Sequence, residues 1–107
     1  MSISTHILDL ARGRPAADVT IRLVGPDGVV HAGRTDADGR CRDLLPPGDL
    51  LPGTWRLEFD IGAYQQALGG EPFYPRATVE FTVNSPPQHF HIPLLLSPYG
   101  YSTYRGS

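Results

Sequence analysis

Apolar and polar residues alternate with a period of two over three stretches of the sequence, 19–23, 54–60 and 78–84. In 54–60, Trp55, Leu57 and Phe59 occupy every second position. Such alternation predicts β-strands with one buried face and one face turned away from the core. Turn-forming segments rich in Gly, Pro and Asp separate the strands, at 25–28, 36–39 and 46–49. Several short strands at this spacing predict an antiparallel β-sandwich.

One segment departs from the alternating pattern. Residues 61–70 contain the helix formers Gln65, Gln66, Ala67 and Leu68 and end on two glycines. A glycine pair after a helical stretch is typical of a helix C-terminus. We therefore expect one short helix here, within a single domain that spans residues 1–107.

Histidines stand at alternate positions of the strand predicted over 88–96. His89 and His91 are two residues apart, so both side chains leave the same face of the strand. Pro93 shares that face and lacks an N–H, which predicts a place at a sheet edge or a bulge. The opposite, core-facing side would hold Phe90, Ile92, Leu94 and Leu96.

A second strand, over residues 3–8, places His6 on its outward face if Ile3 and Ile7 face the core. If this strand and the histidine-pair strand share a sheet, His6 and His91 can lie on one surface. Leu8 and Leu95 would lie there too, and a face that mixes leucine with histidine suits an interface between subunits.

Composition narrows the classes of protein. The net charge of −2 gives no indication of a nucleic acid or an anionic membrane as partner. All nine basic residues are arginines, whose planar guanidinium suits bidentate recognition of oxygens. Cys41 is the one cysteine, which excludes a disulfide framework. With no apolar run near the roughly 18 residues of a membrane span and no secretory pattern at the start, a cytoplasmic protein is expected.

The histidines leave alternatives open. Each can be an ordinary surface or hydrogen-bonded residue, and we keep that interpretation for His31. His89 and His91 could instead bind zinc, with His6 as third ligand, because neutral imidazoles at this spacing suit that metal. The segment Asp36-Ala37-Asp38-Gly39-Arg40 begins like a calcium loop, but Leu45 stands where the later acidic ligand is needed. A tight turn is expected there, with Arg40 as a surface charge.

The C-terminal segment, residues 99–107, carries three tyrosines and an arginine almost to its end. Chain ends that are merely frayed are usually short and polar. Tyrosine and arginine favour contact over solvation, since they combine broad planar groups with hydrogen-bond donors. The composition indicates a tail that packs against the protein and takes part in function.

The motifs together resemble a known family. They are Thr5-His6-Ile7-Leu8-Asp9, Gly13-Arg14-Pro15-Ala16-Ala17, Thr35-Asp36-Ala37-Asp38-Gly39-Arg40, the run from His89 to Pro98, and Tyr101-Ser102-Thr103-Tyr104-Arg105-Gly106-Ser107. Over nearly the whole chain the sequence resembles the 5-hydroxyisourate hydrolases, the transthyretin-related proteins of purine catabolism. The C-terminal Tyr-Arg-Gly-Ser distinguishes that family from transthyretin, the hormone carrier.

The resemblance implies a transthyretin-like sandwich of two four-stranded sheets with one short helix. It also implies a homotetramer with active sites in a channel between dimers, no cofactor and no metal. The implied reaction opens the ring of 5-hydroxyisourate by hydrolysis. His6, Arg40 and His91 would be catalytic, with His91, alone or with His6, as the base; His6, Arg40, Tyr104 and Ser107 would bind substrate.

Two other classes stay open beside the enzyme. A transthyretin-like carrier of a small aromatic ligand would use the same sandwich and channel, but an apolar lining would serve it better than histidine and arginine. A plain sandwich module that binds another protein through its exposed strand faces needs no polar site at all.

Overall fold

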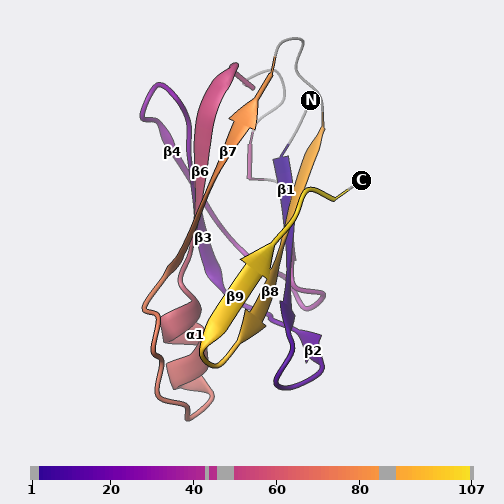
Figure 1. Ribbon diagram of the computed structural model, residues 1–107, viewed down its shortest axis with the longest axis vertical. Helices are drawn as coiled ribbons and strands as arrows, with labels where there is room; N and C mark the ends of the chain where they lie inside the picture. The colour runs from indigo at the N-terminus through magenta and orange to yellow at the C-terminus, as the bar shows by residue number, and fades with distance from the viewer. Residues whose placement is uncertain (1–2, 43, 46–49, 85–88, 107) are drawn as a thin grey trace.

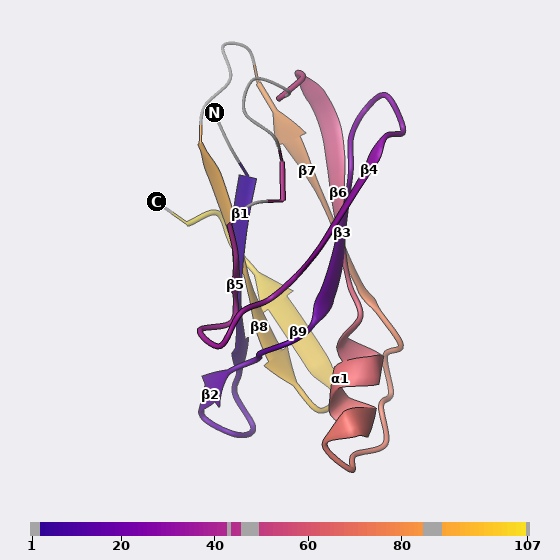
Figure 2. The ribbon, with the colours of Figure 1, turned by 180° about the vertical axis from the view of Figure 1, so that it is seen from behind.

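The computed structural model describes residues 3–42, 44–45, 50–84 and 89–106. Two β-sheets pack face to face, and one short helix lies at one end of the sandwich (Figures 1 and 2). The predicted fold class is confirmed. Each sheet turns the apolar face of its strands toward the other, because that arrangement removes both faces from water at once.

The first sheet has the order β4-β3-β6-β7, and all its pairings are antiparallel. Its strands correspond to the alternating stretches of the sequence. On its outer face, Arg22 binds Glu58 and Asp60 at 3.0 and 2.7 Å. The four strands are β3 (Thr20–Val24), β4 (Val30–Arg34), β6 (Gly53–Phe59) and β7 (Ala77–Val83).

The second sheet has five strands rather than the four expected. The strand order is β2-β1-β8-β9, and β5 also pairs with β1. β2 and β5 are each only two residues long, so both can pair with β1, β2 at Leu8 and Asp9 and β5 at Thr5 and His6. The pairing of β1 with β8 is parallel, which departs from the fully antiparallel sandwich predicted. The strands are β1 (Ile3–Asp9), β2 (Arg14–Pro15), β5 (Arg40–Cys41), β8 (Phe90–Ser97) and β9 (Gly100–Thr103).

The predicted helix is present as α1 (Ile61–Ala67) and ends at the expected glycines. The N–H groups of Leu68 and Gly70 both donate to the carbonyl of Gln65, and Gly69 has a φ of +88°. Gly62 lies against the backbone of Pro75, where a Cβ would come within 2.8 Å. Glycine at this position therefore lets the helix pack against the following segment.

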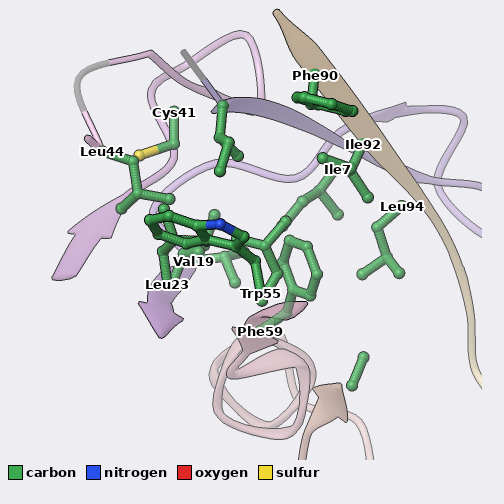
Figure 3. Packing of buried hydrophobic residues seen from close by; sticks show 14 of the residues in the cluster. Ile7, Val19, Leu23, Cys41, Leu44, Trp55, Phe59, Phe90, Ile92 and Leu94 are labelled. Atoms are coloured by element: carbon green, nitrogen blue, oxygen red, sulfur yellow. The ribbon is translucent and has the colours of Figure 1, made fainter. Parts of the chain in front are cut away.

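The core lies between the sheets and includes the one tryptophan of the chain (Figure 3). Trp55 is 1% exposed, and its indole N–H donates to the carbonyl of Leu51 at 2.8 Å. Cys41 is buried in the same core. Within the described ranges, no helix is long and apolar enough to cross a membrane. The other large side chains that are fully buried among the described residues are Phe59, Ile3, Ile7, Ile21, Leu23, Leu57, Ile61, Leu94, Leu96, Val19 and Val83.

Candidate active site

The outer face of the five-stranded sheet carries the predicted histidines. Along β1, buried residues alternate with half-buried ones, and Ser4 and His6 belong to the half-buried set. The parallel register places Ser4 beside His91 and His6 beside Pro93. The prediction that His6 and His91 share a surface is therefore confirmed, and Leu8 beside Leu95 continues the same face.

Arg40 joins this face through the short strand β5. Its register with β1 sets Arg40 directly opposite His6, at the edge of β1 away from β8, because His6 pairs with Pro93 of β8 on its other side. The preceding turn holds Arg40 there, because a carboxylate oxygen of Asp36 accepts the N–H of Asp38 at 2.9 Å and of Arg40 at 3.0 Å. The surface charge expected from the sequence is in fact a half-buried neighbour of His6.

The C-terminal tail runs back along β8, and its backbone is fixed at two points. Leu94 pairs with Thr103, and His91 pairs with Gly106 in the same register. The N–H of Gly106 donates to the carbonyl of His91 at 2.8 Å. The sequence-based prediction that the tail packs against the protein is confirmed for residues 100–106.

β8 runs between β1 and β9, but Pro93 has a ladder partner only on the β1 side, where it pairs with His6. On the tail side Pro93 lies at a local edge of the sheet, as its missing N–H predicts. The β9 ladder ends at Thr103, one residue before the tail passes Pro93, and the hydroxyl of Thr103 donates to the Pro93 carbonyl at 2.7 Å. Pairing resumes at His91, so the tail parts from β8 where proline offers no N–H.

Tyr104 stands across from Pro93 if the register on either side is continued. It is 56% exposed and lines a hollow of about 320 Å³ together with Phe81, Phe90 and Arg105. The guanidinium of Arg105 lies over the Phe90 ring, 4.6 Å from its centre. This hollow opens between β7 and β8, on the core side of β8, so Tyr104 flanks the histidine face. Ser107 lies outside the described residues.

Electrostatics keep His91 neutral. Burial lowers the pKa of His91 below its ordinary value of 6.5, and the charge of Arg40, followed by those of His6 and His89, lowers the pKa further. A hydrogen bond with the backbone of Ser4 raises it and so acts in the opposite direction. Nδ1 of His91 lies 2.9 Å from the Ser4 hydroxyl oxygen. A neutral imidazole can accept a proton, and a guanidinium can stabilise an oxyanion. The two groups together suit hydrolysis.

The structure brings together His6, Arg40 and His91. Within the part of the chain it describes, no group of three or more histidine, cysteine or carboxylate side chains could hold a metal ion. Sequence reasoning missed Ser4 and Gly106. The outward face of Ser4 follows from its alternation with His6, but its neighbour follows only from the parallel register of β1 and β8. Gly106 matters because a Cβ there would come within 2.6 Å of the His91 ring.

Fold and site together define the class: a small two-sheet sandwich that carries a histidine and arginine site on the outer face of one sheet. The HIUase/Transthyretin family model matches residues 3–106, and the chain belongs to that family. It is 49% identical to a 5-hydroxyisourate hydrolase of Caulobacter vibrioides, over 98% of this chain and 97% of that protein.

Two solved structures are similar over almost the whole chain. A 5-hydroxyisourate hydrolase from Klebsiella pneumoniae has a TM-score of 0.89 and 36% identity, with 100% of each chain covered. Sea bream transthyretin in complex with thyroxine has a TM-score of 0.88 and 32% identity, with 99% of this chain and 95% of that one covered. The fold is therefore common to a hydrolase and to a protein that binds thyroxine, so the residues of the site must distinguish the two functions.

Proposed function

We propose that this protein hydrolyses 5-hydroxyisourate to 2-oxo-4-hydroxy-4-carboxy-5-ureidoimidazoline, a step of urate degradation. The observation that carries the proposal is the placement of His6, Arg40 and His91 on one half-buried sheet face. A carrier of an aromatic ligand has no need of this set, and an apolar lining would serve it better. The names of the relatives support the hydrolase over the carrier.

The reaction follows from the protonation states of the site. Nε2 of neutral His91 takes a proton from water as the water oxygen attacks a ring carbonyl of the substrate. Arg40 orients the substrate and stabilises the oxyanion that forms, a contribution of about 3 kcal/mol for one well-placed donor. The ring carbon–nitrogen bond then breaks, and the leaving nitrogen takes a proton from the His91 imidazolium. His6, beside Arg40, binds the substrate and supports the proton transfer.

Tyr104 and Ser107 are proposed to bind substrate as parts of the tail. The hydrogen bond from Gly106 to His91 supports this role, because it holds the described part of the tail beside His91. Tyr104 is exposed enough to reach a molecule bound there. In this arrangement the tail forms one wall of the site.

The site is proposed to be completed in a homotetramer. β7 and β9 are edge strands of their sheets. Residues of β7 line the same hollow as Thr103 at the end of β9, which supports a position of both edges on one side of the sandwich. A second copy can extend both sheets there. The partly apolar face around Leu8 and Leu95 would then meet another dimer, and sedimentation at micromolar concentration tests the assembly. The cytoplasmic location stays a prediction, which cell fractionation would test.

The test of function compares rates with freshly generated 5-hydroxyisourate, made from urate by urate oxidase, against the spontaneous decay. The wild-type protein should accelerate the decay, and His91→Asn should lower kcat/KM at least about a hundredfold because the base is gone. His31→Asn, a substitution on β4 in the other sheet, serves as control and should keep wild-type activity. A wild-type protein that leaves the spontaneous rate unchanged, or an active His91→Asn variant, would contradict the proposal.

A further inference from the structure

The hydroxyl of Ser4 lies between two imidazoles. Its oxygen is 2.9 Å from Nδ1 of His91 and 3.3 Å from Nε2 of His89. The parallel register explains the contact, because Ser4 stands beside His91 and His89 leaves the same face two residues earlier. The three side chains thus form a hydrogen-bonded row from the half-buried His91 to the exposed His89.

The row has a direction, because a serine hydroxyl has a single proton to donate. If that proton goes to His89, the Ser4 oxygen can accept the N–H at Nδ1 of His91, and Nε2 of His91 keeps its lone pair. If the proton goes to Nδ1 of His91 instead, Nε2 must carry the hydrogen. The two arrangements give opposite chemistry, since only the first leaves Nε2 able to act as a base.

We propose that Ser4 and His89 are positioning residues that hold His91 in its Nδ1–H tautomer, with hydrogen bonds directed from His91 to Ser4 and from Ser4 to His89. This inference rests on the proposed function, in which Nε2 of His91 takes the proton from water. His89 is the acceptor that draws the hydroxyl proton away from His91. When Nε2 becomes protonated, Nδ1–H already donates to Ser4 and stabilises the imidazolium.

The charges around His91 disfavour a protonated ring, so the reactivity of His91 depends on which tautomer the neutral ring adopts. β5 contributes Arg40, β1 contributes His6, and the tail carries Arg105 on the other side of β8. Arg40 and the neighbouring histidines all oppose a positive charge on His91 in the free protein. The resting ring is therefore neutral, and the remaining variable is which nitrogen holds the hydrogen.

The test reads the tautomer directly, from the ¹⁵N chemical shifts of the His91 ring in the substrate-free protein at pH 7.5. The wild-type protein should show Nδ1–H. Ser4→Ala should shift His91 toward Nε2–H, the form that free histidine prefers in water, and Ser4→Thr should restore Nδ1–H because it keeps a hydroxyl. His89→Phe should shift His91 in the same direction as Ser4→Ala, and His89→Gln, which keeps an acceptor, should shift it less.

Kinetics supply the second readout. Ser4→Ala should lower kcat by about tenfold to a hundredfold with little change in KM, because the base is mispositioned while Arg40 still binds substrate. Ser4→Thr should recover most of kcat, and His31→Phe, on β4, is the matched control. Nε2–H in the wild-type ring, or an unchanged His91 tautomer in Ser4→Ala, would overturn the inference. The tautomer is measured without substrate, so this result stands apart from a failure of the hydrolase assay.

Discussion

At the scale of single residues, the position of the His91 ring depends on its hydrogen bond with Ser4 and also on Gly106, which has no side chain. Gly106 pairs with His91, and a Cβ at Gly106 would lie 2.6 Å from Cδ2 of the imidazole. Gly106 does not have a positive φ, so the backbone itself would accept alanine. The glycine leaves room for the ring to lie against the tail.

Gly106→Ala should therefore displace the His91 ring and leave the fold intact. We expect kcat/KM to fall about tenfold or more, with a thermal unfolding midpoint close to that of the wild type, because a side chain yields more easily than packed backbone. Gly100→Ala, on the same tail, is the matched control, since nothing lies within 4 Å of its Cβ position. Equal kcat/KM in the two variants would refute the steric role of Gly106.

The sequence predicts well which way a side chain points where apolar residues recur at every second position of a strand. His6 and His91 leave the core because their neighbours at every second position are apolar. It does not predict the partners of Ser4 or Gly106, because those depend on how segments 87 and 15 residues apart align. The alternation of apolar and polar residues is compatible with both parallel and antiparallel strand pairing. The order of the strands in the sheet decides that β1 and β8 pair in parallel.

At the scale of elements, the turn over residues 36–40 determines where Arg40 lies. The sequence predicts the turn, but it does not predict that β5 pairs with β1 some 34 residues away and turns a surface charge into a site residue. Gly39 is the tightest point of the turn. It has a φ of +75°, and a Cβ there would lie 2.5 Å from the Ile7 carbonyl oxygen. The carbonyl of Gly39 accepts the N–H of Ile7 at 2.8 Å, which ties the turn to β1.

Gly39→Ala should lower both stability and activity. The substitution meets two costs, a left-handed backbone conformation of about 1 kcal/mol and the clash with β1. Gly28→Ala isolates the first cost, because Gly28 has a φ of +82° with nothing within 4 Å of its Cβ position. Urea unfolding should show a larger loss for Gly39→Ala, and only that variant should lose kcat/KM, as Arg40 moves from His6. Equal losses in stability would rule out the contact with β1.

At the scale of the whole molecule, the site lies on the outside of one sheet, and the core lies between the sheets. Residues of the site can therefore change without opening the core. The other sheet carries a charged cluster on its own outer face, in which Arg22 binds Glu58 and Asp60, and Arg56 binds Glu58 at 2.9 Å. Hydrogen bonds from Arg22 are the largest cause that lowers the pKa of both carboxyls below their ordinary values of 4.5 and 3.8.

This cluster should make stability depend on pH in the acid range. Because both carboxyls have a lower pKa in the folded protein, the unfolded chain binds protons first, and stability is lost as the pH falls from about 4.5 through the folded values. Arg22→Gln should cost about 1 kcal/mol at pH 7 and clearly less at pH 2.5, because the carboxyls take up protons as the pH falls and their ion pairs with Arg22 weaken. Urea unfolding at fixed protein concentration measures both. Arg34→Gln breaks a far more exposed pair with Asp18 and should change little at either pH. A deficit in Arg22→Gln that is as large at pH 2.5 as at pH 7 would assign the effect to packing of the side chain instead of its charge.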